Sequence, residues 1–590
     1  MVFLLACSER SSETNDPHSQ AKLSNPNELI ALNPKVVQRA DRLPPQVSDG
    51  STTVRPIAES ATEPGEDWQS EEKSVWANDQ LAQLTKGKID TMLAASMEST
   101  PLVPSALTAF KQSRLPGQRA ESLPGAVRPI SSVEFMGQLN RLLEGVETVE
   151  LKPIGIEISD QNRFTTRTRV ELHGPSHEIN TTWECVWQSD QLSGLRVLAY
   201  ETMSTKDGPL FVDVTRSVLT NSPRTDALID HGIEYWNERI TRYGDMYLTG
   251  HHGLAIGDVN GDGLEDVYVC DGGSLPNQLY IQQVDGTAKD MASASGVDFL
   301  EDSRGALLVD LDNDGDQDLV VATVALIIFA ENDGSGKFTL RGGHQGAPYP
   351  ASICAADPDN DGDLDIYACV YEAGDQASGA RWFEARSPVP FNDANNGGRN
   401  VLLGNQGNFQ FADITAEVGL EQNNHRWTFA AAWEDYDQDG DVDLAVANDF
   451  GRNSLYRNDD GKFTDIAAEV GVEDMAAGMS VTWGDYNRDG RMDLYVGNMF
   501  SSAGNRISYQ RQFGGDREAS GLAGVQRMAR GNSLFAAKAD GSGFVDVSEQ
   551  AGVTMGRWAW SSGFVDMDND GWQDLVIANG YLTNTRDVDL

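Results

Sequence analysis

The second half of the chain alternates short apolar runs with acidic, glycine-containing turns. A run of small residues precedes a turn, as in Phe429-Ala430-Ala431-Ala432, and a β-branched or aromatic run follows it, as in Asp493-Leu494-Tyr495-Val496-Gly497. An Asn-x-Leu-aromatic run such as Asn453-Ser454-Leu455-Tyr456 and a fourth run such as Phe463-Thr464-Asp465-Ile466 come next. Short runs of these residue types are typical of β-strands. The pattern therefore predicts four strands per repeat.

The acidic turn is the most regular part of the repeat. It has the pattern D-x-[DN]-x-D-G-x-x-D and occurs six times, in loops 1 to 6, which begin at Asp258, Asp310, Asp357, Asp435, Asp485 and Asp566. Oxygen-bearing side chains at positions 1, 3, 5 and 9 and the backbone carbonyl of position 7 can surround one hard cation, and the glycine at position 6 permits the sharp turn. Calcium takes six to eight oxygen ligands in a flexible shell, so this set suits calcium better than magnesium or a soft metal.

The sequence thus predicts up to six Ca²⁺ sites. Their side-chain ligands are Asp258, Asn260, Asp262 and Asp266; Asp310, Asp312, Asp314 and Asp318; Asp357, Asp359, Asp361 and Asp365; Asp435, Asp437, Asp439 and Asp443; Asp485, Asn487, Asp489 and Asp493; and Asp566, Asp568, Asp570 and Asp574. The position-7 residues, which contribute through the backbone carbonyl, are Leu264, Asp316, Asp363, Asp441, Arg491 and Trp572.

Two other interpretations of the turn are weaker. An EF-hand needs a glutamate at position 12 and a helix on either side of the loop. Position 12 is apolar in every copy, being Val269, Val321, Ala368, Val446, Val496 or Ile577. A solvated Asp/Gly turn would explain a single copy. Six copies with Gly always at position 6 and Asp always at position 9 favour a cation, because carboxylates held together without a counter-ion cost on the order of several kcal/mol.

The spacing of the loops indicates the architecture. Their starts are separated by about 50 residues in three intervals and by about 80 in two. Self-similarity at this period is typical of a propeller or an array, and small residues in the first strand suit the crowded centre of a propeller. We therefore expect a mainly β fold, a calcium-loop β-propeller with six loop-bearing blades. The segment Phe211–Thr215 matches the fourth run, and we expect it to complete the last blade and hide the strand edges.

Several segments resemble a known repeat family. The loops, together with Met499–Arg506, Trp558–Ser562 and Asp566–Trp572, are similar to the FG-GAP/VCBS repeats of the integrin α-subunit propeller. The similarity is closer still to the cartilage acidic protein group and its ASPIC/UnbV-associated bacterial relatives, and it covers roughly residues 225–590. It implies seven blades in all and calcium at the matching loop positions. Members of this group usually carry a further C-terminal module, so we expect either a fragment or a chain without that module.

Four regions are expected along the chain. They are residues 1–65, a truncated signal and disordered tether; 66–125, a helical and linker region; 126–205, a small α+β domain; and 206–590, the propeller. Helical spacing at Trp68–Met97 and Val133–Leu143 predicts helices. Alternating runs at Thr168–Leu172, Thr181–Trp187 and Leu195–Tyr200 predict an antiparallel sheet, for which an NTF2-like fold is one candidate.

The sequence pattern at the N-terminus predicts an exported protein. Leu4-Leu5-Ala6-Cys7 resembles a bacterial lipobox, whose cysteine is acylated, although the apolar stretch is short for a signal and the basic n-region is missing. A chance cysteine in an ordinary N-terminus is the alternative. With the polar segment that follows, the pattern favours a cell-envelope lipoprotein or a periplasmic or extracellular protein. The membrane is then a partner only through a lipid at Cys7.

The amino-acid composition narrows the classes of molecule that this chain can bind. The formal net charge is −45, which disfavours nucleic acid and anionic membranes because both require basic patches. The longest apolar run, Val320–Ala330 apart from Thr323, is shorter than the roughly 20 residues that span a bilayer. The five cysteines, Cys7, Cys185, Cys270, Cys354 and Cys369, give no disulfide framework and no zinc spacing. We expect buried free thiols, with a Cys354–Cys369 bridge as the alternative.

The leading functional hypothesis is a non-catalytic binding, adhesion or scaffold protein whose calcium is structural and whose partner is an extracellular protein or glycan. Two long inserts, Tyr371–Gly398 and Ser501–Gly531, explain the wider loop intervals. Their arginines and aromatics could engage a carboxylate-bearing partner, or could pair with nearby Asp on the same scaffold. The residues concerned are Arg381, Trp382, Phe383, Arg506, Arg511, Arg517, Arg527 and Arg530.

The alternative hypothesis is a calcium-dependent carbohydrate-active enzyme, a polysaccharide lyase or hydrolase. Such an enzyme needs a base or an acid–base pair in a cleft. The candidates are His251, His252, His344, and His425 with Arg426. None of them lies in a recognisable catalytic motif, so the sequence assigns no catalytic residue and leaves enzymatic activity undecided, with a binding protein favoured.

Overall fold

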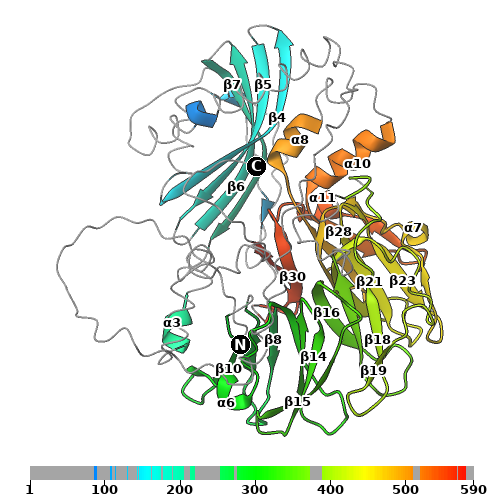
Figure 1. Ribbon diagram of the computed structural model, residues 1–590. Helices are drawn as coiled ribbons and strands as arrows, with labels where there is room; N and C mark the ends of the chain where they lie inside the picture. Colours follow the sequence, from blue (N-terminus) through cyan, green and yellow to red (C-terminus); the bar gives the residue numbers. More distant parts are fainter. Residues whose placement is uncertain are drawn as a thin grey trace, which may run out of the picture. The chain divides into compact units, whose positions relative to one another are not determined.

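A computed structural model of the chain (Figure 1) describes residues 86–89, 107–108, 113–114, 129–130, 143, 145–160, 163–174, 177–188, 191–204, 213–219, 253–271, 275–371, 388–391, 393–508, 519–567 and 569–579. These residues are mainly β and form several antiparallel sheets. Within these ranges, no helix is both long enough and apolar enough to cross a membrane.

A sheet of long strands precedes the repeats. Its principal strands form an antiparallel meander of β4 (Thr148–Asp160), β5 (Arg163–His173), β6 (His177–Gln188) and β7 (Gln191–Ser204). The short strands β1 (Leu107–Thr108), β2 (Ser113–Arg114) and β3 (Pro129–Ile130) extend it beyond β7. The three strands predicted in this region lie within β5, β6 and β7 and are confirmed.

Tryptophans dominate the core of this sheet. Trp183 and Trp187 are buried on one face of β6, and their indole N–H groups donate to the hydroxyls of Thr181 (3.1 Å) and Thr166 (2.9 Å). Ile89 belongs to the same cluster and comes from residues 86–89, which are helical and are the only described part of the predicted helix Trp68–Met97. The predicted helix Val133–Leu143 lies outside the described residues except for Leu143.

Strand β4 was not predicted. Pro153 and Gly155 interrupt its apolar pattern, and both residue types weaken a strand. The structure accommodates them by a shift of register between Pro153 and Gly155 in the pairing with β5. A bulge of this kind lets the strand continue past residues that would otherwise end it.

Six sheets follow, one for each acidic loop. Sheet 1 contains β8 (Leu254–Gly257), β9 (Asp266–Val269), β10 (Gln278–Gln282) and β11 (Ala288–Asp290); sheet 2 contains β12 (Ser303–Val309), β13 (Asp318–Thr323), β14 (Ile327–Asn332) and β15 (Phe338–His344); sheet 3 contains β16 (Pro350–Ala356), β17 (Asp365–Val370), β18 (Val401–Asn405) and β19 (Phe411–Asp413). Sheet 4 contains β20 (Trp427–Glu434), β21 (Asp443–Asp449), β23 (Ser454–Asn458) and β24 (Phe463–Asp465); sheet 5 contains β26 (Gly478–Gly484), β27 (Asp493–Asn498), β28 (Ser533–Ala537) and β29 (Phe544–Asp546); sheet 6 contains β30 (Ala559–Val565) and β31 (Asp574–Asn579).

Four antiparallel strands in chain order make up each of sheets 1 to 5, as the repeat predicts. A separate pair, β22 (Gly451–Arg452) and β25 (Met475–Ala476), lies beside sheet 4. In the second insert the structure forms α8 (Ser502–Ser508) and α10 (Ala519–Arg530). Figure 1 shows the six sheets following one another from green to red.

The first strands of neighbouring sheets approach each other closely. A Cβ atom on Gly253 would lie 2.5 Å from Cα of Gly305 on β12. The Ser352 hydroxyl on β16 donates to the carbonyl of Phe429 on β20 at 2.7 Å, and the hydroxyls of Ser480 and Ser562 lie 2.9 Å apart between β26 and β30. Small residues are therefore required where these strands meet, which explains the small-residue run that precedes each loop.

Short helical turns follow several fourth strands. These are α6 (Ala292–Ser295), α7 (Ala467–Val470) and α11 (Ser548–Ala551), and each ends at a left-handed glycine. The predicted N-terminal strand Phe211–Thr215 is described only from Asp213, and there the chain enters the helix α3 (Thr215–Val218) instead of a strand. The reason is local, because the Asp213 carboxylate accepts the N–H of Thr215 (2.9 Å), as Asp546 accepts the N–H of Ser548 (3.0 Å) before α11.

Substitution of Gly253 by Ala should destabilise the protein by about 1–3 kcal/mol, because the new methyl group meets backbone atoms of Arg304 and Gly305 that cannot move aside. Gly563→Ala is the matched control, since a Cβ atom at Gly563 meets nothing within 4 Å. Chemical denaturation of both variants checks this prediction. Equal stability of the two variants would show that the first strands do not pack as described.

Candidate metal-binding loops

Each acidic loop joins the first strand of a sheet to the second. Position 1 directly follows the first strand, and position 9 is the first residue of the second strand. In loop 2, for example, Asp310 follows β12 and Asp318 begins β13. The two ends of the loop are therefore held by a hydrogen-bonded hairpin, which brings carboxylates that are eight residues apart to the same place.

Two residues in every loop adopt a left-handed backbone conformation. The predicted glycine at position 6 does so in all six copies, with φ between 81° and 102°. Position 4 does so as well, and it is Gly261, Asn313, Asn360, Gln438, Arg488 or Asn569, with φ between 56° and 70°. The sequence analysis missed position 4, although the frequent Gly and Asn there are the residues that best tolerate this conformation.

The loop backbone turns around its own carboxylates. The position-1 Asp accepts the N–H groups of positions 5 and 6 at 2.8–3.2 Å in all six copies. The position-5 Asp accepts the N–H of position 7 at 2.8–3.1 Å. These hydrogen bonds fix the carboxylates inside the turn and leave lone pairs free for a further ligand.

Ligand oxygens converge in three of the loops. Carboxylate oxygens within 4.8 Å of one another belong to Asp310, Asp312 and Asp318; to Asp357, Asp359 and Asp361; and to Asp435, Asp437 and Asp443. Loops 1 and 5 carry Asn at position 3, and the amide oxygens of Asn260 and Asn487 accept the N–H of position 5 at 2.9 Å. In loop 6, Asp568 lies outside the described residues.

The position-9 Asp holds three parts of a sheet together. In loop 2, Asp318 is completely buried, and its two oxygens accept the N–H groups of Leu311 (3.0 Å) in the loop and Asn332 (2.9 Å) on the third strand. The third-strand donors in sheets 1, 3, 4 and 5 are Gln282, Asn405, Asn458 and Ala537, all at 2.8 Å. The sequence pattern assigned position 9 to the cation and did not predict these third-strand partners, which occupy equivalent positions in sheets 1 to 5.

Burial changes the acidity of the position-9 carboxyls. Burial, together with neighbouring loop carboxylates, raises the pKa of Asp318, Asp365 and Asp443 to about 7. The same causes raise the pKa of Asp266 and Asp493 to about 6. Without a cation, these groups therefore take up protons close to neutral pH.

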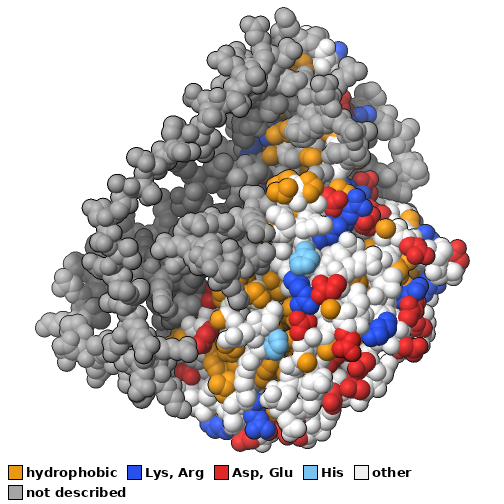
Figure 2. All heavy atoms as spheres, turned by 45° about the vertical axis from the view of Figure 1, so that its right-hand side comes forward, with side chains coloured by type: hydrophobic (Ala, Val, Ile, Leu, Met, Phe, Trp, Pro, Cys, Tyr) orange, Lys and Arg blue, Asp and Glu red, His pale blue; other side chains and the backbone are white. Residues whose placement is uncertain are grey.

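The residues present fit a calcium ion. All side-chain donors are hard oxygens, as calcium prefers. In loop 2, Oδ1 of Asp312 at position 3 is buried without a hydrogen-bond partner, which is costly unless another ligand completes it. Loop 5 is the least favourable copy, because the Arg491 guanidinium already pairs with Asp489 at position 5. Figure 2 shows Asp and Glu side chains gathered in patches on one face of the molecule.

Two of the histidine candidates, His344 and His425, lie in the described part of the chain. Nδ1 of His344 accepts the N–H of Gly346 at 3.0 Å. Arg426, which follows His425 in the sequence, is buried and pairs with Asp393 at 2.9 Å. His251 and His252 lie outside the described residues.

Two insert arginines pair with acids on the same scaffold. Arg527 pairs with the buried Asp474 at 2.6 Å, and Arg530 pairs with Asp546. Arg506 donates to the carbonyl of Pro153 at 2.9 Å. The interpretation that insert arginines pair internally is therefore confirmed for Arg527 and Arg530. Arg381, Trp382, Phe383, Arg511 and Arg517 lie outside the described residues.

The suggested Cys354–Cys369 bridge is wrong. Cys185, Cys270, Cys354 and Cys369 are all free thiols, and Cys7 lies outside the described residues. The register explains this, since Cys354 lies opposite Tyr367 and Cys369 lies opposite Ser352 on the paired strands β16 and β17. Diagonal neighbours on antiparallel strands are roughly 7–8 Å apart, which is too far for a disulfide.

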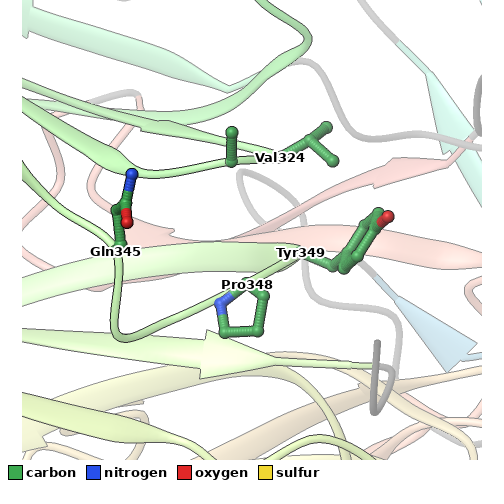
Figure 3. A pocket seen from close by; sticks show the side chains of 5 residues that line it. Val324, Gln345, Pro348 and Tyr349 are labelled. Atoms are coloured by element: carbon green, nitrogen blue, oxygen red, sulfur yellow. The ribbon is translucent and has the colours of Figure 1, made fainter. Parts of the chain in front are cut away.

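One hollow lies at the end of sheet 2 away from loop 2. It has a volume of about 280 Å³ and is lined by Val324, Ala325, Gln345, Pro348 and Tyr349 (Figure 3). These side chains supply one amide and one phenol but no carboxylate or imidazole. The hollow therefore lacks the acid–base pair that glycoside hydrolysis requires.

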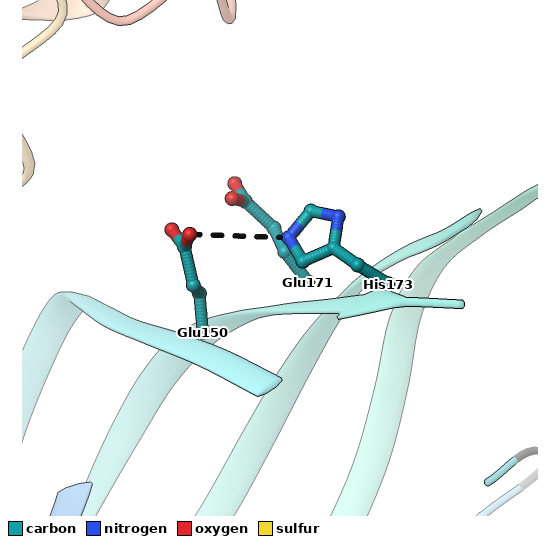
Figure 4. A group of neighbouring side chains, drawn as sticks. All are labelled: Glu150, Glu171 and His173. Carbon is teal, nitrogen blue, oxygen red and sulfur yellow. Dashed lines mark ion pairs between the residues drawn. The ribbon is translucent and has the colours of Figure 1, made fainter. Parts of the chain in front are cut away.

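A second acidic group lies on the long-stranded sheet. Glu150 on β4 and Glu171 and His173 on β5 face one another (Figure 4), with 4.0 Å between Oε1 of Glu150 and Nε2 of His173. Burial raises the pKa of Glu171, but Lys152, Arg169 and Arg557 outweigh it, and the net pKa is lowered. Because these side chains already supply the positive charge, the group is an ion-pair cluster and not a metal site.

Sequence comparison agrees with the loop geometry. Residues 258–321, 310–368 and 435–496 match the family of FG-GAP-like repeats. Cartilage acidic protein 1 of Xenopus tropicalis is 32% identical over 150 residues, covering 24% of this chain and 23% of that protein. The human cartilage acidic protein 1 is 28% identical over 146 residues, covering 24% and 22%. The matches span less than a quarter of the length of these relatives.

Two solved structures show a weaker likeness. One is a lectin from Agrocybe aegerita described as recognising non-reducing terminal N-acetylglucosamine, with 16% identity, a TM-score of 0.31, and coverage of 57% of this chain and 76% of that chain. The other is the Tc holotoxin pore of Photorhabdus luminescens, with 12% identity, a TM-score of 0.23, and coverage of 59% and 14%. Both TM-scores lie below 0.5, so neither neighbour bears on function.

The raised pKa values of the position-9 carboxyls predict that two quantities change with pH in opposite directions: the stability of the metal-free protein and the stabilisation that calcium adds. A pKa raised by folding means that the metal-free folded state binds extra protons between about pH 4 and pH 7, so its stability falls as pH rises through this range. The Tm of EDTA-treated protein should therefore be higher at pH 5.5 than at pH 8. The rise in Tm on adding calcium should be larger at pH 8, because calcium needs the ionised carboxylates.

Thermal unfolding at both pH values measures these effects. The variant Asp318→Asn tests whether Asp318 contributes to this pH dependence. Loss of one titrating group should reduce the pH dependence of the metal-free Tm. A metal-free Tm that rises between pH 5.5 and pH 8 would contradict the described burial of these carboxyls.

Proposed function

We propose that this chain, whose second half carries FG-GAP-like repeats, is a calcium-stabilised β-propeller that acts as a non-catalytic binding protein outside the cytoplasm. The observation that carries the proposal is the convergence of carboxylates in loops 2, 3 and 4, which in loops 2 and 4 come from both ends of the loop and include the buried Asp at position 9. Oxygen ligands brought together by a hairpin hold a cation that ties the first strand of a sheet to the second.

The packing of the sheets supports a propeller. Each small sheet presents its first strand to the first strand of the next, in chain order and at close approach. On the side of β8 that faces away from sheet 2, Leu254 and Ile256 are 42% exposed among the described residues. A further blade fits at this position, which agrees with seven blades in all.

Helix α3 supports closure of the ring. Val218 of α3 packs on Val267, Tyr280 and Ala288 of sheet 1. In the same way, Ala467 of α7, which follows sheet 4, packs on sheet 5. The segment 213–218 thus occupies, relative to sheet 1, the place that the end of a preceding blade would occupy. We infer that the N-terminal segment before it supplies the outer strand of the last blade.

Calcium in this scheme is structural. The ligands of each site belong to one sheet, so the cation stiffens a hairpin and is not directed at a substrate. Extracellular modules bind calcium with Kd values of about 10⁻⁴–10⁻³ M, which suits an exported protein in millimolar calcium. A cell-envelope location, with a lipid at Cys7 as the anchor, and a protein or glycan partner are the corresponding proposals.

Calcium binding is tested by thermal unfolding of the full chain, first with EDTA and then with millimolar calcium or magnesium. We expect a rise in Tm that is selective for calcium, since each occupied site adds RT ln(1 + [Ca]/Kd) to the free energy of unfolding. No rise, or an equal rise with magnesium, would mean that the loops are acidic turns or unselective ion sites.

A matched pair of variants in loop 1 locates the sites. Asp262→Ala removes a carboxylate at position 5, and Glu265→Ala removes an exposed carboxylate at position 8 that is not a ligand. Both variants lose one negative charge from the same loop. Calcium titration calorimetry should show one site fewer for Asp262→Ala and an unchanged number for Glu265→Ala. An equal loss in both variants would indicate diffuse charge attraction instead of coordination.

A further inference from the structure

Neighbouring loops are in direct contact through position 4. The side-chain amide of Asn313 in loop 2 donates to Oδ1 of Asp363 (2.7 Å) and to the carbonyl of Gly362 (3.2 Å), which are positions 7 and 6 of loop 3. Position 4 stands between two predicted ligands of its own loop. Position 7 of the next loop supplies a predicted ligand through its carbonyl. The contact therefore joins the interior of one site to the interior of the next.

The same contact recurs along the chain. The amide of Asn360 in loop 3 donates to Oδ1 of Asp441 in loop 4 at 3.0 Å, and the amide of Gln438 in loop 4 donates to the carbonyl of Gly490 in loop 5 at 3.0 Å. The guanidinium carbon of Arg488 in loop 5 lies 5.0 Å from the centre of the Trp572 ring, at position 7 of loop 6. Loops 2 to 6 thus form a continuous row, although they are 50 to 80 residues apart in sequence.

A second, buried connection runs beneath the first. The side-chain amide of Asn458, at the end of the third strand of sheet 4, donates to the carbonyl of Val442 in loop 4 (3.2 Å) and to the carbonyl of Pro358 in loop 3 (2.7 Å). Asn405 bridges loops 3 and 2 in this way, and Asn332 bridges loops 2 and 1. Each of these asparagines also donates its backbone N–H to the position-9 Asp of its own loop.

We propose that these contacts make calcium binding by loops 2 to 6 positively cooperative, so that a cation in one loop pre-organises the next. The inference rests on the proposed function, because it assumes that the loops bind calcium. A cation fixes positions 3 and 5, which orders the left-handed residue between them and aims its side chain at the neighbouring loop. The neighbour then loses less conformational entropy when its own cation binds. Thermodynamic linkage requires the effect to act equally in both directions.

Repulsion between bound cations opposes this effect without abolishing the attraction of the next loop for its own cation. Loop 3 contains five aspartates, Asp357, Asp359, Asp361, Asp363 and Asp365. A single Ca²⁺ neutralises two of these charges, so an occupied loop 3 remains negative and still attracts a cation to loop 4. Binding in loop 3 therefore weakens, but does not reverse, the attraction of loop 4 for its cation, and positive cooperativity requires the side-chain contact at position 4 to outweigh this loss.

The variant Asn360→Gly tests the proposal. It removes the contact between loops 3 and 4 but keeps a residue that accepts positive φ, and loop 1 already has Gly261 at this position. Calcium titrations of the full chain are followed by hydrogen–deuterium exchange in peptides covering residues 357–365 and 435–443. In the unchanged protein we expect the two loops to become protected together, with a Hill coefficient above 1. In Asn360→Gly we expect both midpoints to move to higher calcium, by about fivefold.

The comparison between the two loops separates coupling from a local effect. If residue 360 merely stabilises its own loop, only the 357–365 midpoint will move, and the proposal is wrong. Asn408→Gly is the matched control, because Asn408 is an exposed residue with φ 54° outside the acidic loops, and its substitution should move neither midpoint. Calcium protection with a Hill coefficient of 1 would overturn cooperativity while leaving the proposed function standing. Absence of calcium protection in the unchanged protein would overturn the proposed function itself.

Discussion

The buried aspartate that begins the second strand of sheets 1 to 5 is the interaction on which these sheets depend. One carboxylate accepts N–H groups from the loop behind it and from the third strand beside it, while standing next to several other negative charges. An asparagine could not replace it freely, because its NH₂ group would face one of those donors. The same oxygens that organise the hairpin therefore create an electrostatic demand that the proposed divalent cation would meet. In the proposed scheme, the fold and cation binding depend on the same carboxylates.

The two long inserts in the repeats lie at the ends of the sheets away from the loops. The two long inserts leave the second strand of sheets 3 and 5 at its far end and return at the third strand, so β17 still pairs with β18 and β27 with β28 in register. Arg527 of the second insert is anchored to Asp474, a buried acid outside the acidic loops. The loop geometry can therefore stay constant while the opposite ends of the sheets change in length and chemistry. This division suits a scaffold that presents variable surfaces on a fixed frame.

Local patterns predicted the repeated strands and the loops well, because strand periodicity and turn glycines act over a few residues. The small-residue strands, the apolar strand after each loop and the glycine at position 6 all lie where the pattern places them. Features that depend on distant neighbours were missed or wrong. The Asn458 amide donates to the carbonyl of Pro358, 100 residues away, and no local sequence pattern predicts this hydrogen bond. The Cys354–Cys369 bridge failed because register, which sequence spacing does not reveal, puts the two thiols on a diagonal. Strand β4 was hidden by Pro153 and Gly155, whose bulge needs a paired partner strand to exist.

Ala537 occupies in sheet 5 the place that a bridging asparagine holds in sheets 2, 3 and 4. Its backbone still bonds to Asp493, but a methyl group cannot reach back to loop 4. Neighbouring sheets among sheets 1 to 4 are therefore joined by buried side-chain amides of third-strand asparagines. Sheets 4 and 5 are joined instead by a buried apolar cluster that contains Ala445, Leu455, Trp483 and Leu494, and by the indole N–H of Trp483, which donates to the carbonyl of Ala432 at 3.3 Å. Neighbouring sheets therefore pack closely in two ways: with a buried amide bridge between their loops in sheets 1 to 4, and without that bridge between sheets 4 and 5.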